Sequence, residues 1–182
     1  MSDYRRWYAP GGTFFFTLVT YRRYPFFRDE AARRLLGEVM REVGEEMPFE
    51  TVAVVLLWDH LHSIWTLPPG DADYSTRWKK IKGEFTRRWL ESGGIELPVS
   101  PSRRSRGERG IWQRRFWEPT ALEPDDLEIR FDYTHYNPVK HGYVRRPRYW
   151  PPSTFHRYVE LGHYAANWGA SEPQHLQGLD FE

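Results

Sequence analysis

The chain has 182 residues, of which 40% are hydrophobic and 17% aromatic, and its formal net charge is +1. These values fit one compact domain with a real core and exclude wholesale disorder. The sequence contains no cysteine, which excludes disulfide frameworks and thiolate metal sites. No apolar run has the length of a membrane span, and the first residues lack the apolar core of a signal peptide. We therefore expect a soluble, cytoplasmic protein.

The first third of the chain alternates strand-like and helical patterns. Residues 13–20 are β-branched and aromatic and follow a Pro-Gly-Gly turn, which predicts a buried strand. Asp29 is suited to cap a helix whose apolar residues recur at helical spacing until Pro48. Residues 49–58 predict a second strand. A tight turn then leads into a third strand, residues 60–67, which we expect to run antiparallel to the second.

The rest of the chain continues the alternation with longer connections. Ser75 is suited to cap a helix over residues 76–91, which has one apolar face and many lysines and arginines around the rest. Residues 92–110 are typical of a long loop, and residues 111–122 again resemble a strand. A third helix is expected from Glu123 to about Asn137, since a residue before proline is disfavoured in the helical region.

This order predicts an α+β fold, a ferredoxin-like split βαβ arrangement with an antiparallel sheet and helices packed on one face. Residues 1–170 are expected to form this single domain. Residues 171–182 contain acidic residues but no lysine or arginine and have little core character. They predict a flexible acidic C-terminal tail.

The triplet His60-Leu61-His62 is the strongest local signal for chemistry. On a strand, residues i and i+2 point to the same face, so both imidazoles would lie side by side while Leu61 enters the core. Two neutral imidazoles at that spacing can share one divalent metal. They can equally be polar residues on a half-exposed strand, and the pattern alone leaves both interpretations open.

A second candidate pair is Tyr133 and Asn137, four residues apart and therefore on one helix face if the helix extends that far. Tyrosine can act as an oxygen nucleophile, and an amide oxygen can bind Mg²⁺ or Mn²⁺. A core tyrosine followed by a helix-ending asparagine is the alternative interpretation.

Charge is distributed unevenly along the chain. Residues 74–115 contain twelve lysines and arginines against four acidic residues, whereas the remainder is net negative. Such asymmetry fits a surface that docks a polyanion, although a solvated basic helix face gives a similar count.

Several segments, in order, resemble the REP-associated tyrosine transposases, which belong to the HUH single-tyrosine transposases, named for a hydrophobic residue between two histidines. The segments that carry the resemblance are 10–17, 59–62, 107–118, 132–142 and 150–158. One departure is Trp58, where the family often has proline, so the turn into the histidine strand can differ here.

The resemblance implies an HUH-type nuclease fold in which His60, His62 and Asn137 bind a divalent metal, Mg²⁺ or Mn²⁺, and Tyr133 is the nucleophile. It implies cutting and rejoining of single-stranded DNA that forms hairpins of repetitive extragenic palindrome type, through a 5′-phosphotyrosine. It further implies a monomer or homodimer at the bacterial nucleoid, without a nucleotide cofactor or a membrane partner. Three neighbours could activate the tyrosine, and the sequence leaves the choice open among Lys140, His141 and His135.

With that resemblance, the basic segment is interpreted as a DNA surface that follows phosphates and clamps a hairpin stem. Its predicted contacts are Lys79, Lys80, Lys82, Arg87, Arg103, Arg104, Arg106, Arg109, Arg114 and Arg115. Three other functions are weighed against the transposase. They are a non-cleaving hairpin-DNA-binding descendant, a metallohydrolase that uses the histidine pair with water, and an RNA-binding ferredoxin-like domain. The complete set of four site residues favours the enzyme over the first. The second and third lack the further ligands or the strand motif that they require.

Overall fold

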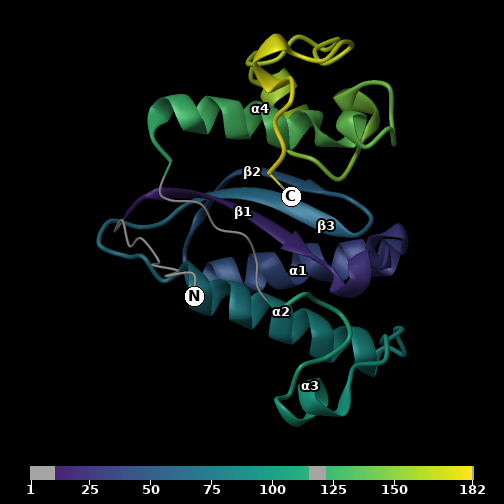
Figure 1. The fold of residues 1–182 in the computed structure, drawn as a ribbon. Helices are drawn as coiled ribbons and strands as arrows, with labels where there is room; N and C mark the ends of the chain where they lie inside the picture. The colour runs from purple at the N-terminus through teal and green to yellow at the C-terminus, as the bar shows by residue number, and fades with distance from the viewer. Residues whose placement is uncertain (1–10, 115–121, 182) are drawn as a thin grey trace.

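A computed structural model describes residues 11–114 and 122–181 of the chain. Within them, three strands form one antiparallel sheet in the order β1-β3-β2 (Figure 1). Their bounds are β1 Thr13–Val19, β2 Glu50–Leu56 and β3 His60–Thr66. All three strands were predicted to within two residues at each end, because alternating β-branched and aromatic residues bounded by turn residues are a local signal.

Helices connect and cover these strands. The α-helices are α1 Glu30–Glu46, α2 Tyr74–Glu91, α3 Pro101–Ser105, α4 Pro124–Lys140 and α5 Phe155–Glu160. Short 3₁₀ turns are η1 Tyr21–Arg23, η2 Phe26–Arg28, η3 Pro147–Tyr149 and η4 Gln174–Leu176. Asp29 caps α1 as predicted, its carboxylate accepting from Ala31 N–H at 2.7 Å. The expected cap of α2 is wrong by two residues, since Asp73 and not Ser75 accepts from Thr76 N–H at 3.0 Å. Among the described helices, none is long and apolar enough to cross a membrane.

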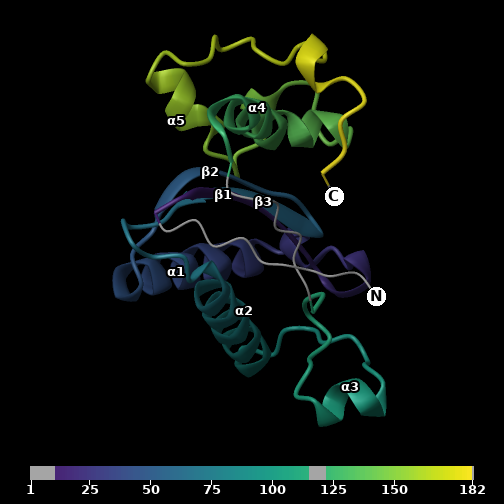
Figure 2. The same ribbon diagram turned by 60° about the vertical axis from the view of Figure 1, so that its left-hand side comes forward.

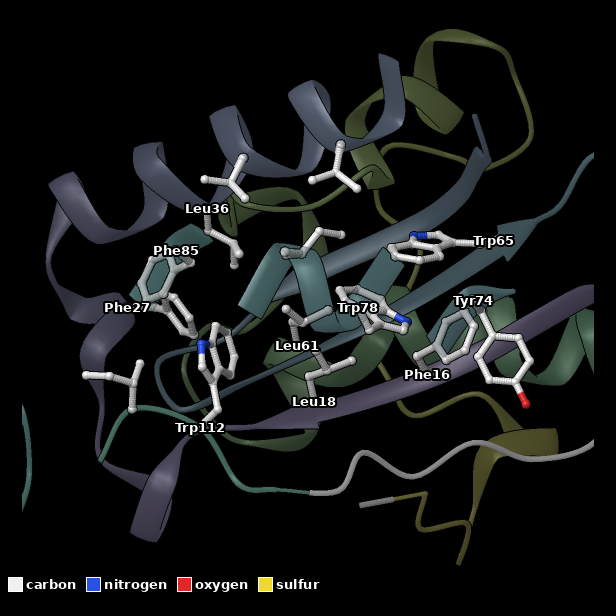
Figure 3. Packing of buried hydrophobic residues seen from close by; sticks show 14 of the residues in the cluster. Phe16, Leu18, Phe27, Leu36, Leu61, Trp65, Tyr74, Trp78, Phe85 and Trp112 are labelled. Carbon is white, nitrogen blue, oxygen red and sulfur yellow. The ribbon is translucent and has the colours of Figure 1, made fainter. Parts of the chain in front are cut away.

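Helices α1 and α2 cover one face of the sheet and enclose the larger part of the core (Figure 3). Alternate residues of β1 and β3 point to this face, because successive side chains of a strand alternate. Phe16, Leu61 and Trp65 are among them, and all three are fully buried. The indole of Trp65 stacks on Trp78 of α2 with 3.9 Å between ring centroids. Offset stacking of this kind adds about 1 kcal/mol to the burial of the two rings.

Helix α4 covers the opposite face, and α5 lies beside it (Figure 2). Phe15 and Ile64, the alternate residues of β1 and β3, pack there against Phe131 and Tyr133 of α4. The sheet is therefore a middle layer between two helical layers. The predicted α+β fold with an antiparallel sheet is confirmed, whereas the expectation that the helices pack on one face is wrong, because α4 covers the face opposite α1 and α2.

Helix α4 continues through Pro138, so the predicted end at Asn137 is wrong. His141 N–H donates to the carbonyl of Asn137 at 3.0 Å, which keeps the last turn closed. An interior proline costs roughly 3 kcal/mol because one helical hydrogen bond is lost. Residues 131–138 are all buried between the sheet and the C-terminal segments, and this tertiary packing offsets that cost.

Other segments protect both edges of the sheet. At the β2 edge, Leu56 N–H donates to the carbonyl of Pro152 at 2.9 Å, and Thr154 N–H donates to Val54 at 2.9 Å. At the β1 edge, Trp112 forms an antiparallel bridge with Thr20. This bridge is the described start of the strand predicted for residues 111–122, most of which lies outside the described residues. Blunted edges of this kind prevent a sheet from pairing with another chain.

The C-terminal segment folds back over α4 (Figure 1). Leu176 is 3% exposed, and His175 donates to or accepts from the Asp132 carboxylate of α4 at 2.8 Å. The chain then descends beside α4 and ends near β1 and β3. The sequence suggested a flexible tail from residue 171, but the described part, residues 171–181, lies against the domain.

Candidate active site

Strand β3 places His60 and His62 side by side on the face covered by α4. Both rings are fully buried, and their centroids lie 5.1 Å apart with the planes nearly perpendicular. Leu61 points to the other face and enters the core with α1 and α2. The structure therefore contains the paired imidazoles that strand alternation predicted.

Each imidazole is oriented through its Nδ1 atom. His60 Nδ1 lies 2.7 Å from the Asp59 carboxylate, and His62 Nδ1 lies 2.9 Å from the hydroxyl of Thr17 on β1. The single proton of Thr17 is donated to the carbonyl of Phe181 at 2.9 Å, so His62 Nδ1 must be the donor in its bond to Thr17. A hydrogen on Nδ1 leaves the lone pair on Nε2, the tautomer that a metal requires. Sequence reasoning missed Thr17, although the strand register places it directly opposite His62.

One stripe of α4 faces these histidines. Tyr133, Asn137 and His141 follow one another at intervals of four residues and so share a helix face. The Tyr133 ring meets the His62 ring edge to face at a centroid distance of 5.4 Å, and the His141 ring meets His60 at 4.9 Å. Asn137 lies one turn from each and therefore faces the imidazole pair.

The amide of Asn137 supports a metal at this position. The side chain is fully buried, and neither its oxygen nor its nitrogen has a hydrogen-bond partner among the described residues. A buried amide without partners costs free energy, and a ligand that uses its oxygen would recover it. Two imidazole nitrogens and one amide oxygen form a donor set that suits a divalent cation. Within the described ranges, no three His, Cys, Asp or Glu side chains are placed together so that they could hold a metal ion.

Lys140, Asp180 and Phe181 lie close to the hydroxyl of Tyr133. Lys140 Nζ donates to it at 2.8 Å, Phe181 N–H donates to it at 3.3 Å, and it lies 3.5 Å from the Asp180 carboxylate. Lys140 occupies the next turn of the same α4 stripe, seven residues after Tyr133. Of the three possible activating residues, Lys140 is thus the one that contacts the tyrosine oxygen.

The other two candidates have different surroundings. His135 is buried on another side of α4, where its ring nitrogens lie 3.1 Å from the Tyr164 hydroxyl and 2.8 Å from Thr154. Burial lowers the pKa of His135 to about 3, so the ring stays neutral and serves the packing of α4. His141 instead meets the His60 ring edge to face, at 4.9 Å between ring centroids. The neighbouring Tyr136 faces Trp168, at 6.2 Å between ring centroids, and burial raises its pKa.

The basic segment forms a groove of about 1160 Å³ between α2 and the chain that follows it. The predicted DNA contacts that line this groove are Lys79, Lys82, Arg87, Arg104, Arg109 and Arg114. Lys80, Arg103 and Arg106 lie outside the lining, and Arg115 lies outside the described residues. Since α2 and α3 lie on the sheet face opposite α4, the groove and the histidine site are separate surfaces (Figures 1 and 2).

Many of these cations already have acidic partners. The Arg109 guanidinium donates twice to the Glu96 carboxylate at 2.7 Å, and this bond lowers the pKa of Glu96 to about 2. Glu108 pairs with Arg103 at 3.5 Å and Arg106 at 3.0 Å. Further pairs involve acids of α1 and α2, namely Lys80 with Glu46 and Arg87 with Glu84 and Glu91. Exposed pairs of this type contribute about 0–1 kcal/mol, so a phosphate can replace the carboxylate at little cost.

Lys82 differs from the other groove cations because it faces inward. Its Nζ donates to the carbonyl of Gln113 at 2.6 Å, and burial lowers its pKa to about 8. This bond fastens the loop wall of the groove to α2. Lys82 can therefore hold the groove in shape, in addition to the phosphate contact that the sequence predicted for it.

Two known proteins are similar to this chain in sequence over more than nine tenths of their length. A REP-associated tyrosine transposase of Escherichia coli (strain K12) is 40% identical over 169 residues, which cover 92% of this chain and 91% of that protein. A relative of the same kind from Haemophilus influenzae is 38% identical over 183 residues, covering 98% and 99% of the two chains. The chain belongs to the REP-associated tyrosine transposase family. It is accordingly a transposase of the single-tyrosine type.

A solved structure described as the REP-associated tyrosine transposase bound to a REP hairpin is also similar. Its TM-score is 0.76 and its identity 37%, with both chains covered completely. This likeness confirms the α+β fold of the HUH type. No family model matches the chain.

Proposed function

We propose that this transposase cuts and rejoins single-stranded DNA that carries a hairpin of REP type, with Tyr133 as the nucleophile. His60, His62 and Asn137 would hold a divalent cation, Mg²⁺ or Mn²⁺. The observation that carries the proposal is that three groups lie on one side of the sheet, between β3 and α4. They are the oriented imidazole pair, the Tyr133 ring, and the Asn137 amide, which has no hydrogen-bond partner among the described residues. A structural role alone does not account for a fully buried amide without hydrogen bonds.

Cleavage is a phosphoryl transfer to tyrosine. The Tyr133 oxygen attacks the scissile phosphorus, a new P–O bond forms, and the bond from phosphorus to the 3′ oxygen breaks. The tyrosine proton passes to solvent and the departing oxygen takes one from solvent, which gives a 3′-hydroxyl and a 5′-phosphotyrosine. A 3′-hydroxyl can later attack the same phosphorus, so rejoining needs no nucleotide cofactor. A bound cation would supply positive charge to a non-bridging phosphate oxygen.

Lys140 favours the reactive form of Tyr133. A free tyrosine has a pKa of about 10 and is mostly protonated at neutral pH. An ammonium group that donates to the phenolic oxygen stabilises the phenolate, which is the attacking form. Because Lys140 lies on the helix that carries Tyr133, the two groups keep their relative position when DNA binds.

The DNA would use both faces of the protein. We place the hairpin stem in the basic groove, because the similar solved complex contains a REP hairpin and the groove carries most of the predicted phosphate contacts. The groove wall at Trp112 joins the β1 edge next to Thr20. A single-stranded extension can therefore pass this edge and reach Tyr133. The protein up to residue 170 would form the catalytic domain, and residues 171–181 would close over its site.

The deciding experiment is incubation of the purified protein with single-stranded DNA from the flanks of its own gene in the presence of Mn²⁺. We expect a covalent protein–DNA adduct, with the DNA attached at Tyr133 by mass spectrometry. Specific binding of the hairpin without any adduct in Mg²⁺ or Mn²⁺ would favour the alternative function, a non-cleaving hairpin-binding protein. The four intact site residues argue against that alternative.

A further inference from the structure

An aromatic ring from the C-terminal segment fills a slot beside Tyr133. The guanidinium carbon of Arg130 lies 3.4 Å from the centroid of the Phe181 ring, which is stacking distance. The edge of the slot is formed by Tyr133, 4.7 Å from Phe181 between centroids, and by Phe15, 6.1 Å away. Arg130 also lies over Phe15, 5.1 Å from that ring. The slot is thus lined by a flat cation and two aromatic rings.

The residue before Phe181 places a negative charge next to the same tyrosine. The Asp180 carboxylate accepts from Lys140 at 2.9 Å and lies 3.5 Å from the Tyr133 hydroxyl. The scissile phosphate must come to this position, because the phenolic oxygen attacks phosphorus directly. The end of the chain therefore holds an anion and a planar ring one residue apart, in the places that a phosphate and its neighbouring base would need.

We propose that Arg130, with Phe15 and Tyr133, forms a stacking subsite for the unpaired base next to the scissile phosphate, and that Asp180 and Phe181 stand in for that nucleotide. The inference rests on the proposed role of Tyr133. Guanidinium planes and aromatic rings stack on exposed bases of single-stranded nucleic acids, and the contact tolerates different bases. Positive charge on Arg130 favours a base that is attached to a phosphate backbone. The subsite would hold the strand in place during attack.

A simpler account is that Arg130 only fastens the C-terminus. The two accounts differ in whether Arg130 stacks on a base of the bound DNA. Arg130→Lys keeps the charge but removes the flat stacking surface. Arg157→Lys is a matched control, because Arg157 is exposed on α5 and lies over the Tyr158 ring, at 5.6 Å, away from Tyr133.

The first test measures binding without cleavage, in a Tyr133→Phe background. Hairpin oligonucleotides would carry 2-aminopurine at each unpaired flanking position in turn, since its fluorescence falls when the base is stacked. We expect one position to be quenched on binding, the quenching to disappear with Arg130→Lys and to persist with Arg157→Lys. Phe181→Ala should deepen the quenching by vacating the slot. Quenching that does not respond to Arg130→Lys, or its absence at every position, overturns the subsite.

The second test is a double-mutant cycle that combines a change in the protein with a change in the DNA and measures binding affinity. An abasic site at the quenched position should weaken binding about tenfold, the usual size of one base stack. Arg130→Lys should weaken binding of the intact strand by a similar factor and that of the abasic strand hardly at all. Independent losses that multiply to about a hundredfold would mean that Arg130 acts through phosphate or through folding. Neither test depends on an adduct, so a failure of the nucleophile assignment is recognised separately.

Discussion

Ending the chain at Leu179 should speed adduct formation, because it removes the last three residues, of which Asp180 and Phe181 cover Tyr133. Their contacts are the Lys140–Asp180 ion pair, the Arg130 stack on Phe181, and two hydrogen bonds of the Phe181 backbone, one with Thr17 and one with Tyr133. The ion pair contributes about 0.5 kcal/mol, since Asp180 is 71% exposed. The two hydrogen bonds and the stack contribute about 1 kcal/mol each.

These contacts total about 3.5 kcal/mol, ordering the two residues costs about 2 to 3 kcal/mol, and the net stabilisation of the closed arrangement is about 1 kcal/mol. DNA can bind only to molecules in which the C-terminal residues have left Tyr133. A closed arrangement favoured by that free energy makes such molecules the minority and weakens the apparent DNA affinity roughly fivefold. Truncation at Leu179 should therefore raise the initial rate of adduct formation at subsaturating DNA about fivefold. The gain should be somewhat larger at low ionic strength, where the Lys140–Asp180 pair is less screened.

Truncation after Ala170 would be a poorer test. It would also remove Leu176, which is 3% exposed, and the contact of His175 with Asp132, so it would lower the stability of the domain. Within the short tail, Asp180→Asn isolates the ionic contact and Phe181→Ala the aromatic one. If the rate and the DNA affinity of the Leu179-terminated chain match the full chain at low salt, the segment does not cover the site in solution.

Further outcomes follow from the site, the groove and the packing of α4. His62→Ala should abolish cleavage and leave hairpin binding nearly intact, and a chelator-treated protein that cuts at the original rate would refute the metal. Tyr133→Phe should remove the adduct entirely while Tyr136→Phe only weakens activity; DNA found on Tyr136 by mass spectrometry would move the active face of α4. A hairpin with single-stranded flanks should bind more tightly than perfect duplex, with affinity falling steeply as salt rises, and equal affinity for both would indicate a nonspecific surface. Substitution of glutamate for Arg103, Arg104 and Arg106 reverses the charge there and should weaken hairpin binding without changing metal affinity. The free energy of unfolding should decrease as pH falls from about 6.5 to about 3, because His135 is neutral in the folded protein and takes up a proton when the protein unfolds. Urea titrations across this pH range measure the decrease, and His135→Gln should make it smaller.

Several parts of the site could be predicted from the sequence because they depend on local geometry. Strand alternation placed His60 and His62 on one face, and helical spacing placed Tyr133 and Asn137 on one stripe. The family resemblance supplied their roles, which remain a proposal. Local preference failed at Pro138, where burial of the whole α4 turn outweighs the tendency of proline to end a helix.

Only the tertiary structure decided which residues far apart in the chain contact each other. Lys140 could be chosen over His135 and His141 only when side-chain directions around Tyr133 were known. The approach of Phe181 to Tyr133 spans 48 positions, and no local pattern specifies it. The sequence by itself determined the three strands, the long helices α1, α2 and α4, the faces on which the reactive side chains lie and the family, but it missed the short helices α3 and α5 and the end of α4. The packing of α4 against the sheet decided which groups meet at Tyr133, because that depends on long-range burial rather than on the preference of any one segment.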